Sequence, residues 1–180
     1  MNVVKTRLND CVIIEPKVFG DHRGFFLETF QAERYAEIAN IKQPFVQDNH
    51  SRSSKGVLRG LHFQINNPQG KLVRVVRGEV FDVAVDLRPD SSSFGQWEGV
   101  ILSEENKRQF WVPPGFAHGF VVTSDTADFE YKCTDYYDPS DEGSIAWNDT
   151  DLAIAWPEGI EMKLSAKDAA APSFKEYLKR

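Results

Sequence analysis

Residues 80–87 read VFDVAVDL, and their side chains fall into two alternating sets. Phe81, Val83, Val85 and Leu87 form one set, while Val80, Asp82, Ala84 and Asp86 form the other. A period of two places the two sets on opposite faces of a β-strand. A second predicted strand, residues 71–77, comes just before it. The intervening Arg77-Gly78-Glu79 predicts a hairpin turn between the two strands.

Short strand patterns of the same kind recur along the chain and are separated by Pro, Gly, Ser or Asp clusters. They cover residues 12–14, 24–30, 57–64, 98–102, 109–112, 119–122 and 129–134. Only residues 31–39 and 173–178 have helical patterns, and the tail 147–172 is expected to wrap over the strands. Many short strands within 180 residues predict a single all-β domain, residues 1–180, folded as an antiparallel jelly-roll barrel with a few short peripheral helices.

Composition narrows the classes of function. The net charge of −6 disfavours nucleic acid as a partner, because binding to a phosphate backbone needs a basic surface. No apolar run is long enough to span a membrane, and the first residues lack a secretory signal. Two isolated cysteines, Cys11 and Cys133, favour reduced thiols in a cytoplasmic protein. The charge is compatible with a small phosphorylated ligand, which needs only a few local cations. Basic residues cluster at Arg52, Arg59, Lys71, Arg74 and Arg77.

Two histidines occur in motifs related to metal-binding β-barrels. Residues 113–118, PPGFAH, have the Pro-x-Gly-x-x-His pattern of the second cupin motif and end at His118. The first cupin motif would supply His-x-His, but here Gln64 stands where the second His is expected after His62. Catalytic metal sites usually need three protein ligands. We therefore expect no metal and no cofactor.

His62 is the strongest candidate for acid–base chemistry. A histidine in a barrel is often a hydrogen-bonded core residue, but His62 lies close in sequence to Arg59 and Lys71. A His beside a carboxylate suits general-base work near neutral pH, and a Lys can stabilise a developing oxyanion. The chain has no nucleophile elbow, dinucleotide fingerprint or phosphate loop that would indicate a rival chemistry. These residues favour proton abstraction next to a carbonyl.

Ordered motifs along nearly the whole chain resemble those of the dTDP-4-dehydrorhamnose 3,5-epimerase family, cupin-fold enzymes of dTDP-L-rhamnose synthesis. The matching stretches are residues 21–28 (DHRGFFLE), 47–51 (QDNHS), 56–64 (GVLRGLHFQ), 70–73 (GKLV), 82–88 (DVAVDLR), 114–120 (PGFAHGF), 147–149 (WND) and 164–168 (LSAKD). An ordered set of this length is far more specific than any single motif.

The resemblance implies a catalytic role for four residues. His62 would remove the protons at C3 and C5 of a 4-keto sugar, and Asp168 would orient its imidazole. Lys71 would stabilise the enolate at the C4 oxygen. Tyr131 would return a proton from the opposite face, which inverts the configuration.

The resemblance also implies a dTDP-sugar site and a homodimer that exchanges an N-terminal segment. The binding positions are Arg23, Glu28, Gln47, Asn49, Arg59, Lys71, His118, Tyr137, Glu142 and Lys167, with Tyr137 stacking on thymine. Arg23 and Glu28 are candidates to serve the neighbouring subunit's site. Arg59 and His62 have an odd spacing, so they share a face only if Gly60 marks a bulge or Arg59 reaches around an edge.

The expected reaction is conversion of dTDP-4-dehydro-6-deoxy-D-glucose to dTDP-4-dehydro-L-rhamnose. Three alternatives stay open at this stage. A relative that epimerises only C3 or only C5 would keep the same four catalytic residues. A metal-dependent cupin oxygenase is disfavoured by the missing ligands. A non-catalytic sugar-nucleotide binding module is disfavoured because both a candidate base and a candidate acid are present.

Overall fold

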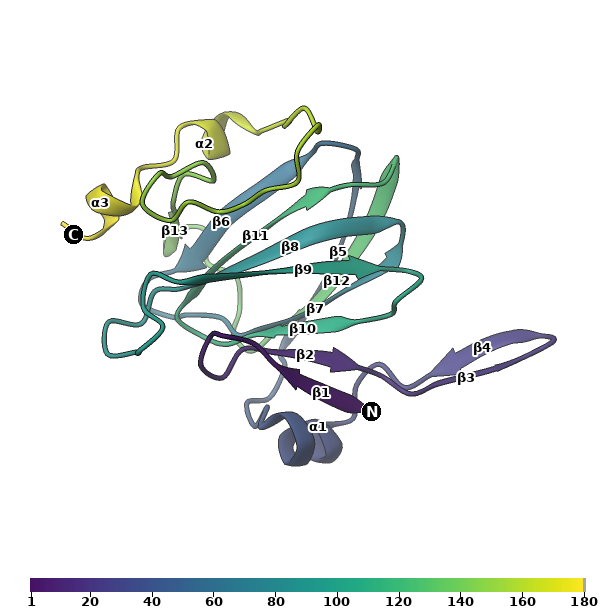
Figure 1. Ribbon diagram of the computed structural model, residues 1–180. Helices are drawn as coiled ribbons and strands as arrows, with labels where there is room; N and C mark the ends of the chain where they lie inside the picture. Colours follow the sequence, from purple (N-terminus) through teal and green to yellow (C-terminus); the bar gives the residue numbers. More distant parts are fainter. Residues whose placement is uncertain (180) are drawn as a thin grey trace.

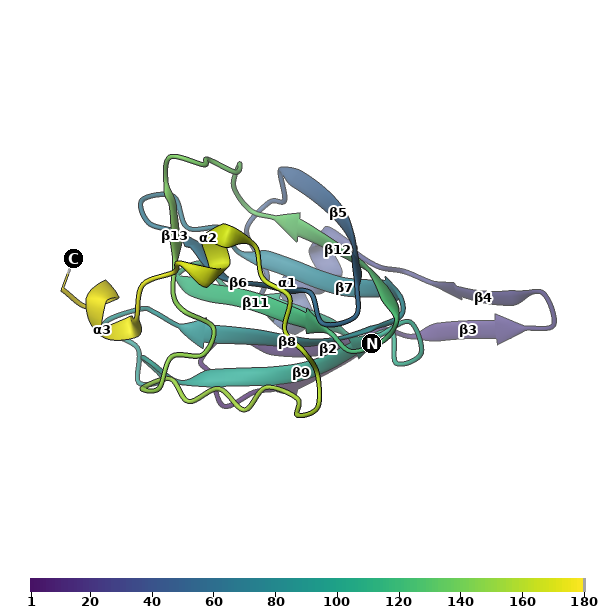
Figure 2. The same cartoon turned by 90° about the horizontal axis from the view of Figure 1, so that it is seen from above.

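Two antiparallel sheets face each other in the computed structural model, which describes residues 1–179 (Figures 1 and 2). The six-stranded sheet has the order β1 (Asn2–Lys5), β2 (Val12–Glu15), β10 (Gln109–Val112), β7 (Lys71–Arg77), β12 (Thr126–Cys133) and β5 (Gln47–Ser54). The five-stranded sheet has the order β13 (Glu142–Ser144), β6 (Leu58–Gln64), β11 (Phe116–Val122), β8 (Glu79–Asp86) and β9 (Trp97–Ser103). The remaining elements are β3 (Val18–Asp21), β4 (Gly24–Leu27), α1 (Ala32–Ala39), α2 (Ala166–Ala169) and α3 (Phe174–Tyr177). The expected antiparallel all-β fold with short peripheral helices is confirmed.

The alternation in β8 is explained by burial on both faces of its sheet. Val80 and Ala84 pack into the core between the sheets. Val83 and Val85 belong to a second apolar cluster on the outer face, together with Leu152 of the tail and Phe174 just beyond it. The tail therefore covers the outer face of the five-stranded sheet, as the sequence predicted, and it lies beside β6 and β13 in both ribbon views (Figures 1 and 2).

The predicted hairpin at Gly78 is wrong. β7 pairs with β10 and β12, whereas β8 pairs with β9 and β11 in the other sheet. Gly78, with φ of +72°, is thus a corner between the sheets, and a Cβ there would lie 2.0 Å from the Thr126 carbonyl oxygen. Short-range patterning shows where a chain turns but not whether the following strand stays in the same sheet, because that depends on packing with distant strands.

Several other elements differ from the expectations. The predicted strand 24–30 ends at Leu27, and β1, β3, β13 and the short α2 were not foreseen. The strand β5 was also missed, because its sequence, QDNHSRSS, contains no hydrophobic residue. It forms through backbone pairing with β12 along its whole length.

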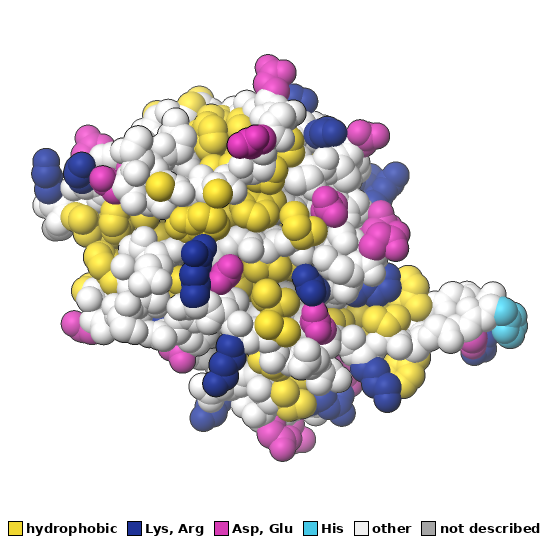
Figure 3. Space-filling view, viewed as in Figure 1, with side chains coloured by type: hydrophobic (Ala, Val, Ile, Leu, Met, Phe, Trp, Pro, Cys, Tyr) yellow, Lys and Arg dark blue, Asp and Glu magenta, His cyan; other side chains and the backbone are white. Residues whose placement is uncertain are grey.

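The β3–β4 hairpin projects from the sandwich (Figures 1 and 3). Phe19, Phe25 and Phe26 on it are 52%, 62% and 70% exposed. In the space-filling view hydrophobic side chains lie near the base of this projection and a His marks its tip (Figure 3). Adjacent exposed aromatics of this kind are typical of an interaction surface rather than of a free hairpin.

A bulge in β6 resolves the odd spacing of Arg59 and His62. Arg59 pairs with Phe120 and His62 pairs with His118, so two residues of β6 stand opposite the single residue Gly119. Gly60 has φ of +127°, and a Cβ there would lie 2.5 Å from the Cα of Gly119. The extra residue turns both Arg59 and His62 toward one cavity, as the sequence-based alternative with a bulge at Gly60 required.

Candidate active site

A cavity of about 550 Å³ opens between the two sheets and contains His62. Its walls come from β6 and β11 on one side and from β5, β7 and β12 on the other, and residues 163–168 close one side. A smaller hollow of about 190 Å³ adjoins it and shares His62, Lys71, Tyr131, Tyr137 and Glu142 with it. Residues separated by more than a hundred positions in the sequence thus surround one space.

His62 and Asp168 form a close pair at the wall of this cavity. The Nε2 atom of His62 lies 2.5 Å from Oδ1 of Asp168, and Asp168 is only 4% exposed. An ionised carboxylate only accepts hydrogen bonds, so this contact assigns the proton to Nε2 of the neutral imidazole. The other ring nitrogen, Nδ1, then carries the free lone pair that a base needs.

Glu142 provides a second carboxylate on the other side of the imidazole. Its Oε1 atom lies 4.0 Å from Nδ1 of His62, and its other oxygen accepts hydrogen bonds from Lys167 and, at 2.7 Å, from the Tyr137 hydroxyl. Burial by itself would raise the pKa of Glu142, but the bonds from Lys167 and Tyr137 hold it below its ordinary value. Glu142 is therefore an anion that lies beside the imidazole of His62.

Lys71 and Tyr131 lie on the opposite wall, on neighbouring strands of the six-stranded sheet. Lys71 Nζ is 6.0 Å from the centre of the Tyr131 ring. Burial lowers the pKa of Lys71, although Cys133 and Glu142 act in the opposite direction. Burial also raises the pKa of Tyr131, so its hydroxyl stays protonated and is available as a proton donor.

The structure brings most of the predicted binding residues to the same place. Arg59, His118, Tyr137, Glu142 and Lys167 line the large cavity, and Gln47 and Asn49 line the adjoining hollow. The Gln47 side chain donates to Asn49 Oδ1 at 3.1 Å and accepts from the Tyr137 backbone N–H at 3.0 Å. Of the basic cluster noted in the sequence, Arg52 and Arg74 instead pair with Asp128 and Glu130.

Arg23 and Glu28 do not reach this cavity within the chain. Arg23 sits at the turn of the projecting hairpin and bonds Asp21, and Glu28 pairs with Arg34 just beyond that hairpin. The structure therefore does not bring these two predicted binding residues to the cavity of their own chain.

Sequence reasoning missed three residues that support the site. Asp82 accepts from His118 Nε2 at 2.9 and 3.0 Å, and its inward position in the alternating strand was the available signal. Ser53 accepts hydrogen bonds from the Arg59 guanidinium at 3.1 and 3.2 Å. Ser165 bonds the carboxylate of Asp168 at 2.9 Å, and its place three residues before Asp168 is typical of a helix N-cap.

Gln64 stands where the first cupin motif has its second histidine, and its side chain hydrogen-bonds to the backbone of neighbouring loops. Its Nε2 donates to the carbonyls of Asn67 and Tyr136 at 2.7 and 3.2 Å, and its Oε1 accepts from the Asp138 backbone at 2.8 Å. It thus ties together two loops beside the cavity. Across residues 1–179, no group of three His, Cys, Asp or Glu side chains is arranged to hold a metal ion.

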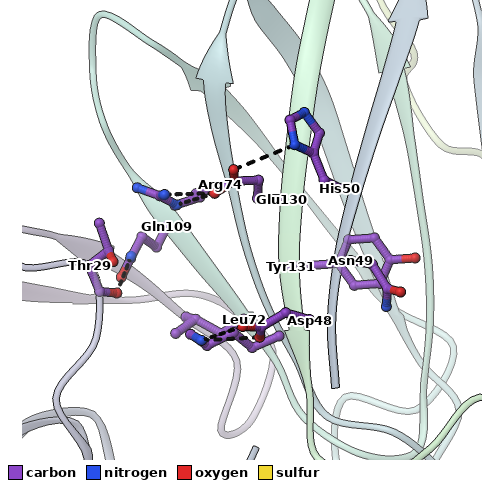
Figure 4. A pocket seen from close by; sticks show the side chains of 10 residues that line it. Thr29, Asp48, Asn49, His50, Leu72, Arg74, Gln109, Glu130 and Tyr131 are labelled. Atoms are coloured by element: carbon purple, nitrogen blue, oxygen red, sulfur yellow. Dashed lines mark hydrogen bonds and ion pairs between the residues drawn. The ribbon is translucent and has the colours of Figure 1, made fainter. Parts of the chain in front are cut away.

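A separate hollow of about 380 Å³ lies on the other side of the six-stranded sheet (Figure 4). Its charged side chains are paired with one another, as in the contact of Arg74 with Glu130 and of Lys132 with Asp48. His50 adds a contact of 3.7 Å to Glu130. Asn49 and Tyr131 also line this hollow, but His62, Lys71 and Asp168 do not, so the cavity between the sheets remains the candidate active site.

An antiparallel sandwich whose inner cavity holds a His–Asp pair, a lysine and a tyrosine is a cupin-like fold equipped with the side chains of an acid–base enzyme. Comparison with known proteins gives the family. The family model described as dTDP-4-dehydrorhamnose 3,5-epimerase matches residues 5–176. The chain is 60% identical over 179 residues to the dTDP-4-dehydrorhamnose 3,5-epimerase of Salmonella typhimurium, covering 99% of this chain and 98% of that protein. It belongs to the dTDP-4-dehydrorhamnose 3,5-epimerase family, as its motifs predicted.

Solved structures agree with this assignment. A dTDP-6-deoxy-D-glucose-3,5-epimerase from Legionella pneumophila in complex with dTDP-4-keto-L-rhamnose is 62% identical, with a TM-score of 0.94 over 97% of this chain and 93% of that one. A 3'-monoepimerase from Streptomyces bikiniensis in complex with dTDP-quinovose is 35% identical, with a TM-score of 0.89 over 97% and 89% of the two chains. Single-site and double-site epimerases therefore share this fold. Among residues 1–179, the structure contains no helix long and apolar enough to cross a membrane.

Proposed function

We propose that this protein epimerises C3 and C5 of dTDP-4-dehydro-6-deoxy-D-glucose and thereby forms dTDP-4-dehydro-L-rhamnose for dTDP-L-rhamnose synthesis. The observation that carries the proposal is the contact of 2.5 Å between His62 and the buried Asp168, in a cavity whose other wall holds Lys71 and Tyr131. Membership in an epimerase family supports a catalytic protein over a binding module or an oxygenase.

The proposed reaction begins with proton abstraction by His62. The ketone at C4 makes the hydrogens on C3 and C5 acidic, because the electron pair left behind can move onto the C4 oxygen. Nδ1 of His62 takes the proton, while Asp168 on Nε2 and Glu142 near Nδ1 stabilise the imidazolium that forms. The Lys71 ammonium stabilises the enolate oxygen.

Reprotonation completes each inversion. Tyr131 gives its phenolic proton to the carbon from the opposite face. The enolate's carbon–carbon double-bond electrons form the new C–H bond, and an electron pair on the C4 oxygen re-forms the ketone. His62 then releases its proton to solvent, and Tyr131 recovers one. The positions of His62 and Tyr131 on opposing sheets support this division of roles.

The nucleotide half of the substrate has its own proposed contacts. Arg59 and Lys167 are the cations for the diphosphate, with His118 for a phosphate or sugar oxygen. Tyr137, which is 52% exposed beside Gln47 and Asn49, would stack on thymine.

Incubation of the chelator-treated protein with the dTDP-keto sugar in D₂O tests the proposal. We expect NMR to show solvent deuterium at both C3 and C5 without added metal, since one base serves both carbons. The 60% and 62% identities to double-site enzymes, against 35% to the monoepimerase, support two centres. Label at one carbon would make the protein a single-site epimerase, and no label would remove this substrate from consideration.

We further propose that two copies associate and exchange the β3–β4 hairpin. The exposed Phe19, Phe25 and Phe26 supply an apolar surface for the contact, and Arg23 and Glu28 lie on or beside the hairpin without reaching their own chain's cavity. In the exchanged dimer these two residues would complete the substrate site of the other subunit.

Mixing two inactive variants tests the exchange. Arg23→Ala and His62→Ala homodimers should each have little activity, but a mixed dimer contains one site with both native residues. Random reassociation should therefore restore about a quarter of the parent activity, since half of the dimers are mixed and each has one good site of two. The two variants carry different affinity tags, so that purification through both tags isolates the mixed dimer. No activity in that mixed dimer would place Arg23 in its own chain's site.

Two further proposals concern the cellular compartment and the domain organisation. The free, buried thiols of Cys11 and Cys133 support a reducing compartment such as the cytoplasm. We also propose that residues 1–180 act as one domain, because β1 near the start and the tail near the end both pack on the same pair of sheets.

A further inference from the structure

Ser165 touches Asp168 through two separate hydrogen bonds. Its hydroxyl donates to Oδ2 of Asp168 at 2.9 Å and accepts the backbone N–H of the same residue at 3.1 Å. The second contact makes Ser165 the N-cap of α2. The first is not needed for capping, because a cap only has to accept.

These two contacts restrict the direction of the hydroxyl proton. A serine hydroxyl has one proton and two lone pairs. With a lone pair engaged by the Asp168 N–H, the proton points to Oδ2. Asp168 then presents its other oxygen, Oδ1, to His62 at 2.5 Å. Ser165 thus determines which carboxylate oxygen faces the base and limits rotation of the carboxylate.

The segment that carries Ser165 is itself attached to the strand that carries His62. The Lys163 N–H donates to the Gly56 carbonyl at 2.8 Å, and the Leu58 N–H donates to the Lys163 carbonyl at 3.0 Å. Leu58 is the first residue of β6, which holds His62. Ser165 therefore lies two residues beyond a fixed attachment point, and its distance from the imidazole is well defined.

We propose that Ser165 is a positioning residue for the epimerisation, acting through Asp168 on the proton affinity and orientation of His62. The inference rests on the proposed roles of His62 and Asp168. By sharing the negative charge of Asp168, the Ser165 proton keeps that carboxylate from holding the imidazolium proton too strongly. The base can then release its proton after each abstraction.

Other charged or titratable groups around the pair constrain the expected pH effect. Glu142, held by Lys167 and Tyr137, faces Nδ1 of His62 from β13. The same cavity is lined by Arg59 from β6, Lys71 from β7, His118 from β11, Tyr131 from β12 and Lys163 from the segment before α2. None of these groups is changed by a substitution at Ser165. A shift of the pH profile in Ser165→Ala, which adds no charge, would therefore report on Asp168 and His62.

Three substitutions separate capping from proton donation. Ser165→Thr keeps both functions, Ser165→Ala removes both, and Ser165→Asp keeps a good cap acceptor but has no proton to donate when ionised. We expect Ser165→Ala and Ser165→Asp to lower kcat by about 10- to 100-fold, with KM within about twofold of the parent value. Ser165→Thr should keep a kcat close to that of the parent. The acidic limb of the kcat profile should move to higher pH in Ser165→Ala.

Two comparisons make the result decisive. If Ser165→Asp matches the parent, or if Ser165→Ala lowers kcat equally at all pH values, Ser165 is only a helix cap and the proposal is wrong. In an Asp168→Ala background, Ser165→Ala should cause no further loss of kcat. Parent-like turnover of Asp168→Ala itself would instead contradict the proposed His62–Asp168 pair, and thermal melting of each variant identifies losses due to unfolding.

Discussion

His62→Ala should abolish deuterium incorporation at both C3 and C5 of the keto sugar. The loss should be at least about 10³-fold in rate, because the variant lacks the only proposed base, whereas Asp168 behind it and Lys71 across the cavity remain in place. Both carbons should be affected together, since both flank the same carbonyl. The measurement is NMR of the substrate in D₂O.

His50→Ala is the matched control for this variant. His50 is half-exposed, pairs with Glu130, and does not line the cavity between the sheets. It should therefore retain near-parent exchange. If exchange at either carbon survives in His62→Ala at near the parent rate, a second base must act at that carbon.

Tyr131→Phe should separate proton removal from inversion. The variant keeps the aromatic ring that packs against Phe129, with ring centres 5.9 Å apart, but it has no phenolic proton to give. His62 can still remove a proton and return one to the same face. We therefore expect deuterium to enter the substrate with retained configuration while formation of the epimer falls by about 10²-fold or more.

Tyr136→Phe serves as the control, because Tyr136 is 67% exposed and its side chain is absent from the cavity wall. It should epimerise at the parent rate. Near-parent inversion by Tyr131→Phe would show that another group is the acid. Loss of both label and inversion would show that Tyr131 is required already for the abstraction step.

Local patterns predicted much of the sandwich, and their errors have a common cause. The alternation in β8 was read correctly, since it reflects which face each side chain occupies. The sheet change at Gly78 and the strand β5 were missed, because both depend on partners distant in the sequence. Polar residues such as Gln47 and Asn49 form a strand when a neighbouring edge offers backbone hydrogen bonds.

The family motifs identified most of the candidate residues, but they did not show which of these side chains contact one another. Ser165 and Asp82 escaped notice because a serine or an aspartate in a short motif usually has a local structural role. The odd spacing of Arg59 and His62 would place them on opposite faces of a regular strand. The structure shows that the bulge at Gly60 brings both side chains to the same cavity.

The sequence by itself determined that this is an antiparallel β protein of the 3,5-epimerase family, with His62 as its candidate base. These conclusions depend on local periodicity and on ordered motifs, which can be read directly from the linear sequence. The tertiary structure decided that Asp168 takes Nε2 and leaves Nδ1 free, that Lys71 and Tyr131 face His62 from the other sheet, and that Arg23 is remote from its own cavity. Such facts depend on packing between different segments of the chain, as for His62 and Asp168, which are 106 residues apart, and no local pattern contains that information.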